Sequence, residues 1–269
     1  MIVETDAIPA SDDTETATTV DSLLGGRIEI EQPRKGGHRA GLDALFLAAA
    51  VPDHATGLVV DLGAGVGTAG MAAAARVPGI DVMLVERDPD ISQLARANLT
   101  RPANISFANR CRVVQADIAE PMRAREAAGL GREIAAHVLI NPPFYRPRTV
   151  RSSPSPQRAD AHVLEGEGLD AWARAAVSIL EPRGRLTVIF RGDGLPEILT
   201  AFADRVGEVS IFPLFPREGL AAHRLIVSGV KGSRAAPRIL PGLVLHPATT
   251  GRYLPDAQAI LTGARHLYG

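Results

Sequence analysis

Residues 58–67 read Leu-Val-Val-Asp-Leu-Gly-Ala-Gly-Val-Gly and give the strongest indication of the fold. The apolar run from Leu58 to Asp61 predicts a short buried strand, and the alanine-rich stretch from Thr68 to Arg76 predicts a helix. The glycines between them let the backbone turn sharply and let a ligand approach closely. A strand, a glycine loop and a helix in this order indicate a binding site for a nucleotide-type cofactor.

Two cofactors fit this layout. The spacing Gly65-x-Gly67-x-x-Gly70 satisfies the dinucleotide fingerprint of NAD-binding proteins. Asp61, however, ends the strand before the first glycine, where a carboxylate repels a pyrophosphate and favours a cationic amino-acid group. S-adenosylmethionine (SAM) carries an ammonium and a sulfonium and no phosphate, so we favour SAM over NAD. In the alternative role, Asp61 only caps the loop by accepting backbone N–H groups; one carboxylate can do both.

Two further acids follow strands. The predicted strand from Asp81 to Val85 ends in Glu86, whose carboxylate is placed to accept hydrogen bonds from both ribose hydroxyls. Residues 111–116 predict another strand, and Asp117 follows it. There a carboxylate can accept from the adenine amino group, with Ile118 packing on the ring. The alternative is that Asp117 is the N-cap of a helix over residues 118–121.

The motif Asn141-Pro142-Pro143-Phe144 follows a fourth apolar run, from Ala135 to Ile140. Two consecutive prolines end that strand and stiffen the backbone beyond it. The amide oxygen of Asn141 and the carbonyl of Pro142 can each accept one hydrogen of a flat amino group. Phe144 can stack on the ring that bears the amine, an interaction worth roughly 1–3 kcal/mol for a base. We therefore predict that these three residues form the catalytic turn.

Alternating apolar runs and helical patterns predict an α/β fold, a Rossmann-like doubly wound sheet of seven strands. The sheet is expected to be mostly parallel and to close with an antiparallel hairpin of residues 208–215 and 221–230, because their connection is short. In an open parallel sheet the four strand ends with Asp61, Glu86, Asp117 and Asn141 share one edge, where ligands bind.

These motifs together resemble the class I SAM-dependent methyltransferases that act on planar amino groups. From about Leu24 onward the chain is similar to the bacterial tRNA (adenine-N6)-methyltransferase family, the methyltransferase small-domain type, which modifies the adenine beside the anticodon of a valine tRNA. The closer likeness rests on Gly41-Leu42-Asp43, in a segment that opens a helix over the SAM site in the family. His223-Arg224 and residues 253–264 also look similar, with less specificity.

The resemblance implies that Asp61, Gly63, Gly65, Glu86 and Asp117 bind SAM and that Asn141, Pro142 and Phe144 hold the base. With their neighbours, the expected cofactor-binding residues are Asp61, Gly63, Ala64, Gly65, Gly67, Glu86, Arg87, Asp117, Ile118 and Asn141. The expected substrate-binding residues are Phe144, Tyr145, Arg146, Arg148, Arg151, Arg39 and Asp43. This chain has Phe144 where many relatives have tyrosine, which preserves stacking and removes a hydroxyl.

Composition bounds the remaining possibilities. A chain of 269 residues with 46% hydrophobic residues is long enough for one large α/β domain. We expect residues 1–24 to be a disordered acidic tail and residues 25–269 to be a single methyltransferase domain. One cysteine, Cys111, allows no intrachain disulfide. With no signal-peptide pattern and no apolar run of bilayer-spanning length, we expect a cytoplasmic location and no membrane partner.

Charge is unevenly distributed. The formal net charge is −1, but six acids and no basic residues lie in the first 26 residues, so the remaining body carries −1 + 6 = +5. Arg146, Arg148, Arg151 and Arg158 follow Phe144 in a Pro- and Ser-rich loop with no acid among them. Such a loop can grip the phosphates of a tRNA partner; alternatively, it is an ordinary solvated loop. None of the seven histidines pairs at metal-ligand spacing, so we expect no metal.

Three alternatives stay open. The Asn-Pro-Pro-aromatic motif specifies a planar nitrogen better than it specifies adenine, so the acceptor can be a protein glutamine amide or guanine N2. An NAD-dependent oxidoreductase would use the Gly65-x-Gly67-x-x-Gly70 frame, although no hydride-transfer site is evident. A protein that binds SAM without activity is the third. Oligomeric state does not follow from the sequence.

Overall fold

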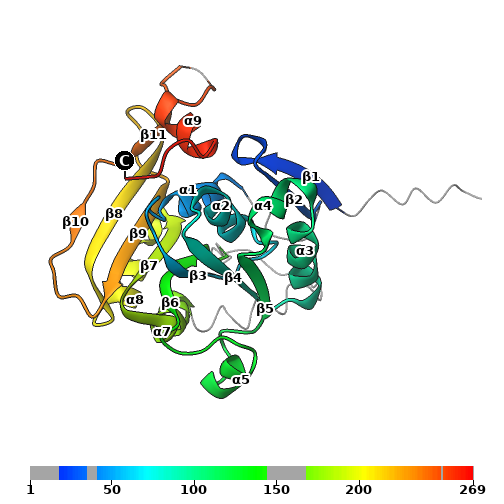
Figure 1. Cartoon of the computed structure of the whole chain (residues 1–269). Coiled ribbons are helices and arrows are strands. Elements are labelled where there is room, and N and C mark those ends of the chain that lie inside the picture. The colour runs from blue at the N-terminus through cyan, green and yellow to red at the C-terminus, as the bar shows by residue number, and fades with distance from the viewer. Residues whose placement is uncertain (1–17, 35–40, 144–167, 250, 269) are drawn as a thin grey trace, which may run out of the picture.

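The computed structural model describes residues 18–34, 41–143, 168–249 and 251–268. A mostly parallel sheet crosses the molecule, and helices cover both of its faces (Figure 1). The strands are β1 (Thr18–Leu23), β2 (Ile28–Pro33), β3 (Gly57–Leu62), β4 (Ile80–Glu86), β5 (Cys111–Gln115), β6 (Ala135–Ile140), β7 (Leu180–Arg191), β8 (Val206–Arg217), β9 (Arg224–Lys231), β10 (Arg238–Ile239) and β11 (Leu243–His246). The helices are α1 (Leu42–Ala49), α2 (Thr68–Arg76), α3 (Pro89–Leu99), α4 (Ile105–Ala108), α5 (Met122–Ala127), α7 (Gly168–Ile179), α8 (Leu195–Phe202) and α9 (Pro255–Leu261), with short 3-10 turns at residues 24–26, 102–104 and 192–194.

The strand order of the main sheet is β10-β8-β9-β7-β6-β3-β4-β5, with β11 also paired to β8. β3 lies between β6 and β4, and these three strands, together with β5 and β7, all run parallel. β9 is antiparallel to both β7 and β8. The predicted α/β class, the doubly wound arrangement and the closing antiparallel hairpin are therefore confirmed.

Two apolar cores lie against the sheet. One contains Phe46 of α1, Met71 of α2 and Ile260 of α9 together with the buried residues of β2. The other contains Trp172 and Ile179 of α7 and Phe202 of α8. Because both faces are covered, β3, β4 and β6 read as continuous apolar runs without polar alternation.

The predicted strand count of seven is wrong for this chain, because the main sheet of the described residues has nine strands. The two additional strands, β10 and β11, have two and four residues and are mostly not buried. Segments this short and exposed carry no detectable apolar alternation. Both pair in parallel with β8 and extend the sheet beyond the predicted hairpin.

The prediction of a disordered tail through residue 24 is wrong for residues 18–24. Thr18–Leu23 form β1, which pairs along its whole length with β2 in an antiparallel hairpin, and Leu24 is buried. A Thr/Asp-rich composition hides this strand, since only the partner strand supplies the apolar residues Ile28 and Ile30 that anchor the hairpin. Residues 1–17 lie outside the described part of the chain.

Two segments of the chain have irregular backbone. α8 ends at Phe202, because Ala203 has a ψ of 136° and Asp204 has a φ of 60°. β7 begins at Leu180, directly after α7, and includes Pro182 and Gly184. A register shift between Ala135 and His137 of β6 faces this part of β7, and such irregular pairing accommodates a proline.

Within the described residues, no helix combines the length and the apolar character needed to cross a membrane. In the same part of the chain, no group of three His, Cys, Asp or Glu side chains is placed to hold a metal ion.

Candidate active site

Four polar residues meet at the carboxyl edge of the parallel strands. Asn141 follows β6, Asp61 and Glu86 lie at the ends of β3 and β4, and Asp117 stands two residues after β5. These strands are adjacent in the order β6-β3-β4-β5. The sheet therefore brings together the four residues that the sequence places on successive strand ends.

The glycine loop between β3 and α2 follows a path that side chains disfavour. Gly63, Gly65 and Gly67 have φ values of 76°, 56° and 94°. A Cβ on Gly63 would lie 2.5 Å from Cη2 of Trp172, whereas a Cβ on Gly65 would meet nothing within 4 Å. The N–H groups of Gly63 and Ala64 both donate to the Val85 carbonyl, at 2.9 and 2.8 Å. Gly65 thus borders open space that a ligand can fill.

Asp61 is 2% exposed, and its Oδ2 accepts from the Gly70 N–H at 2.8 Å. Gly70 is in the first turn of α2, whose N-cap residue Gly67 has no side chain to do this. Asp61 therefore supplies the missing cap. Burial raises the pKa of this carboxyl to about 7, the Gly70 hydrogen bond opposes that shift, and the nearby Glu86 carboxylate adds to it. A cation beside Asp61 would favour its ionised form.

Glu86 joins the glycine loop to α3. Its Oε2 accepts from the Gly65 N–H and its Oε1 from the Asp88 N–H, each at 2.9 Å. Asp88 in turn caps α3 by accepting from Asp90 and Ile91, with Pro89 in the first turn, as the sequence predicts. The side chain of Glu86 fixes the loop from the strand next to it.

Asp117 accepts from the Ala119 N–H at 2.8 Å through Oδ1, and its Oδ2 lies 3.9 Å from Nη1 of Arg87. Residues 118–121 form a turn, and α5 begins only at Met122. The alternative of a helix N-cap over residues 118–121 is therefore wrong, because Pro121 directly precedes the helix. Ile118 is partly buried against the second core.

Asn141 differs from the three acids. Its Oδ1 is buried and has no hydrogen-bond partner among the described residues. Pro142 next to it is buried, and Pro143 is half-buried. Buried polar atoms are nearly always hydrogen-bonded, and an exception requires an explanation such as strain, a catalytic role or a bound water or ion.

Of the predicted substrate-binding residues, Asp43 lies in the described part of the chain and the others lie outside it. Arg39, Phe144, Tyr145, Arg146, Arg148 and Arg151, and the rest of the basic loop with Arg158, lie outside the described residues. Asp43, in the first turn of α1, accepts from Nε of Arg224 on β9 at 2.8 Å. This ion pair thus connects the first turn of α1 to β9 of the sheet.

Three residues outside this set behave as packing residues. Trp172 and His137 are buried. Nε2 of His137 lies 2.8 Å from Oγ1 of Thr187, and burial lowers the pKa of the imidazole to about 3. Burial also raises the pKa of the Cys111 thiol to about 12, so the thiol is unreactive at neutral pH.

A Rossmann-like sheet with a glycine loop and acids at successive strand ends defines a nucleotide-cofactor enzyme. The model of the methyltransferase small domain family matches residues 41–209, more than half of the chain. The chain belongs to this family of methyltransferases. It is a SAM-dependent enzyme, and the resemblance seen in the sequence is confirmed.

Similar proteins agree with this assignment. A tRNA1(Val) (adenine(37)-N6)-methyltransferase of Porphyromonas gingivalis is 28% identical over 81% of this chain and 85% of its own length. One of the same name from Shewanella amazonensis is 27% identical over 55% of this chain and 58% of its own length. A solved structure from Agrobacterium tumefaciens, described as a predicted O-methyltransferase, is 33% identical, with a TM-score of 0.72, over 83% of this chain and 97% of that one.

The residues at the sheet edge fit SAM. Gly65 leaves space on the loop, and the buried Asp61 carboxyl is suited to a cationic amino-acid moiety.

Asn98, a further residue that contacts the loop, was not predicted from the sequence. Its only signal is an asparagine near the end of a helix, a residue type with low helix propensity.

Proposed function

We propose that this enzyme transfers a methyl group from SAM to the exocyclic amino group of an adenine in tRNA, the base beside the anticodon of a valine tRNA. The observation that carries the proposal is the buried, unpartnered Oδ1 of Asn141. An amino group on a flat ring offers two hydrogens, and this oxygen can accept one of them. The two relatives named for adenine-N6 methylation support adenine as the acceptor.

SAM, when bound, supplies the activated methyl group. Asp61, Glu86 and Asp117, with Gly63, Ala64, Gly65, Gly67, Arg87 and Ile118, are proposed to hold it. Asp61 would face the cationic amino-acid part, Glu86 the ribose and Asp117 the adenine. Their strand order supports this division, since β3 with Asp61 lies next to β6 with Asn141 and so keeps the cationic part of SAM near the acceptor turn.

At the acceptor turn, Asn141 Oδ1 and the Pro142 carbonyl would take the two amino hydrogens. Accepting both fixes the amine and favours the positive charge that develops on nitrogen. The rate enhancement then comes mainly from alignment, and no strong base is required because the amine becomes acidic only after transfer. Phe144 would stack on the base, which must leave its own stack to reach the turn.

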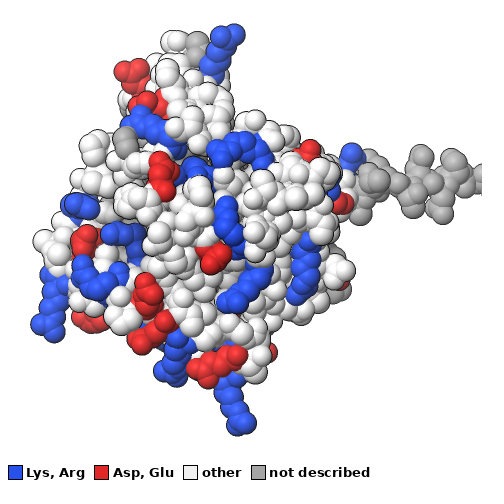
Figure 2. Space-filling view, viewed as in Figure 1, with Lys and Arg blue, Asp and Glu red and all other residues white. Residues whose placement is uncertain are grey.

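The distribution of charge gives a separate argument about the substrate. On the face shown in Figure 2, basic and acidic side chains of the described residues are interspersed. We assign the grip on tRNA phosphates to the arginine-rich loop, Arg146, Arg148 and Arg151, together with Arg39, because the arginines after Phe144 have no acid among them in the sequence. A tRNA substrate also agrees with the cytoplasmic location that we expect from the sequence.

A second acceptor is suggested by the Agrobacterium tumefaciens protein, which is described as a predicted O-methyltransferase. A hydroxyl has only one hydrogen and needs a base to remove it before or during transfer. The buried amide oxygen of Asn141 is a hydrogen-bond acceptor and a poor base, so it favours the amino group.

Digestion and mass spectrometry of tRNA decide between these acceptors. Unmodified valine tRNA transcript, the enzyme and labelled SAM should yield N6-methyladenosine, and a transcript with guanosine in place of that adenosine should yield none. Label in 2′-O-methyl nucleosides would identify a ribose hydroxyl as the acceptor, and label in N2-methylguanosine would identify guanine N2. Either result would contradict adenine N6. If the enzyme binds SAM but methylates no tRNA, the next acceptor to test is the glutamine amide of a protein.

A further inference from the structure

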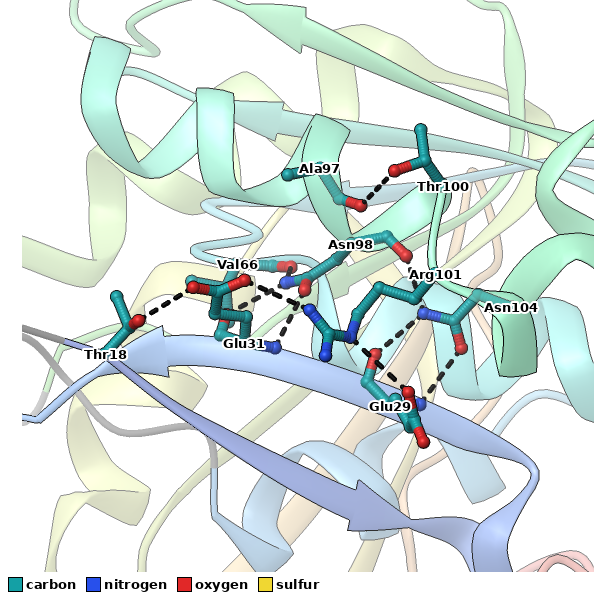
Figure 3. Close-up of polar contacts among 9 residues, drawn as sticks. All are labelled: Thr18, Glu29, Glu31, Val66, Ala97, Asn98, Thr100, Arg101 and Asn104. Atoms are coloured by element: carbon teal, nitrogen blue, oxygen red, sulfur yellow. Dashed lines mark hydrogen bonds and ion pairs between the residues drawn. The ribbon is translucent and has the colours of Figure 1, made fainter. Parts of the chain in front are cut away.

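Two buried asparagines dock the β1-β2 hairpin on the rest of the fold (Figure 3). Asn98 stands near the end of α3 and Asn104 at the end of the following 3-10 turn, and both are 0% exposed. Oδ1 of Asn98 accepts from the Glu31 N–H at 2.8 Å, and its Nδ2 donates to the Glu31 carbonyl at 3.0 Å. Asn104 makes the same two bonds to the N–H and carbonyl of Glu29, at 3.0 and 2.7 Å.

These side chains replace a neighbouring strand. β2 pairs with β1 on one edge, and on its other edge the two amides satisfy alternate backbone groups that would otherwise lack partners. Arg101 adds an ion pair to each side chain, at 3.5 Å to Glu29 and 3.1 Å to Glu31. Asn98 and Asn104 therefore hold the hairpin in the same way, each through one backbone N–H and one carbonyl of β2.

The third hydrogen bond distinguishes them. Nδ2 of Asn98 also donates to the carbonyl of Val66, at 3.2 Å, whereas Nδ2 of Asn104 donates to the carbonyl of Asn98 itself, at 2.7 Å. Val66 is inside the glycine loop, between Gly65 and Gly67. Of the two asparagines, Asn98 therefore links the hairpin to the loop, and Asn104 does not.

Both ends of α3 thus reach the loop at consecutive residues. At its start, Glu86 bridges the Gly65 N–H and the Asp88 N–H. Near its end, Asn98 holds the Val66 carbonyl. Left-handed glycines flank Val66, and the Val66–Gly67 peptide is held at both of its polar atoms: the Val66 carbonyl accepts from Asn98, and the Gly67 N–H donates to the Ala64 carbonyl at 2.9 Å.

We propose that Asn98 is a positioning residue for the cofactor: it keeps the glycine loop in the path that receives SAM and couples that path to the docked hairpin. The inference rests on the proposed role of this loop in holding SAM. Without the Asn98 amide, the Val66 carbonyl loses its side-chain donor, the loop is held less firmly, and part of it must be ordered each time SAM binds. That ordering weakens affinity for SAM.

Asn104 provides a matched control for a test. In the full chain, Asn98→Ala and Asn104→Ala each remove three buried hydrogen bonds, two of them to β2, so both should lower the melting temperature to a similar extent. Calorimetry with SAM, at a temperature where circular dichroism shows each protein folded, should give a Kd about tenfold higher for Asn98→Ala, as for one lost buried hydrogen bond. Asn104→Ala should stay within about twofold of the wild type. Hydrogen exchange at residues 65–67 should accelerate in Asn98→Ala alone.

Equal changes in Kd for the two variants, or none in either, would overturn the proposal. If an alanine variant does not fold, Asn98→Asp and Asn104→Asp give the same comparison, because aspartate keeps the acceptor for the β2 N–H and loses the donors. Gly65→Val separates the two levels of the argument. If that variant binds SAM normally, the loop does not hold SAM; if it fails to bind SAM while Asn98→Ala binds it normally, only the role of Asn98 is wrong.

Discussion

The two halves of the sheet edge differ in how their polar atoms are satisfied. On the cofactor side, Asp61 and Glu86 accept backbone N–H groups from Gly70, Gly65 and Asp88. On the acceptor side, Asn141 Oδ1 is buried without a partner among the described residues. The proposed cofactor side therefore contributes to folding, since its carboxylates cap helices and hold a loop. The proposed acceptor side contains an unpaired buried acceptor, which costs roughly 1–3 kcal/mol of stability.

This comparison predicts opposite signatures. Substitutions on the cofactor side should change stability and SAM affinity together. Substitutions at Asn141 should change turnover and leave stability unchanged or increased.

The largest expected effect belongs to Asn141→Ala. Loss of the amide acceptor should lower kcat about 10²–10³-fold, the scale seen when a preorganised hydrogen-bonding group is removed. The Kd for SAM should stay within about threefold, and the melting temperature should not fall. Single-turnover methyl transfer, calorimetry and thermal denaturation check the three parts.

Asn141→Asp is the matched variant, because its carboxyl keeps an acceptor oxygen in place and should retain more activity than alanine. A parallel loss of SAM binding and turnover in Asn141→Ala would contradict the separation of the two sides.

Next in size is Gly65→Ala, compared with Gly129→Ala. Both glycines have positive φ, and a Cβ on either meets nothing within 4 Å. Each alanine should therefore cost about 1–2 kcal/mol of stability through backbone strain. Only the Cβ at Gly65 points into the proposed SAM space, so the SAM Kd should rise about 10- to 100-fold for this variant alone. If calorimetry gives similar Kd values of SAM for the two variants, Gly65 does not border the SAM site.

The pKa of Asp61 sets a pH dependence. Since burial raises it from 3.8 to about 7 in the folded protein, the folded state holds this proton more tightly than the unfolded chain. The contribution of Asp61 to stability is then greatest at low pH, falls as the pH rises from about 4 to 7, and is level above 7.

SAM favours the ionised carboxylate, so its affinity should rise between pH 5.5 and 7, by at most about tenfold per unit. In this range the SAM ammonium stays protonated, because an α-amino group has a pKa of about 7.7–8.0. Calorimetry on the wild type and Asp61→Asn checks this. Asparagine keeps the bond from Gly70 and cannot titrate, so its profile should be flatter and its SAM affinity at pH 7 lower.

The smallest effect is expected at Cys111. With a thiol pKa of about 12, alkylation at pH 7.5 should be very slow in the folded enzyme and fast in denaturant. Mass spectrometry of iodoacetamide-treated protein measures both rates, and Cys111→Ser should retain full activity. Rapid labelling of the folded enzyme would show that β5 opens readily.

Much of the cofactor side could be predicted because its signals are local. A strand, a glycine loop and a helix are contiguous from Leu58 to Arg76, and the structure has α2 at the predicted residues. Asp88 and Pro89 mark the start of α3 in the same local way. Each of these features depends on backbone geometry that a few neighbouring residues dictate.

Other features depended on distant partners. β1 has little apolar character of its own and forms because β2 lies beside it, and β2 is held on its other edge by the amides of Asn98 and Asn104. The turn at Asp117 replaced the predicted helix cap because the next helix starts only after Pro121. Asp43 was predicted to touch substrate, but its contact with Arg224 spans 181 positions of the chain and has no local signal.

The glycine loop and the acids after the strands follow from the sequence alone, because steric limits on glycine and apolar runs act over a few residues. That β6, β3, β4 and β5 are neighbours, which places Asn141 on the strand next to that of Asp61, follows only from the tertiary packing. The packing also decides that the Asn98 amide reaches Val66 while the Asn141 oxygen meets no partner among the described residues. Side-chain amides can bond to any backbone segment that the fold brings near, so their partners depend on packing and not on spacing along the chain.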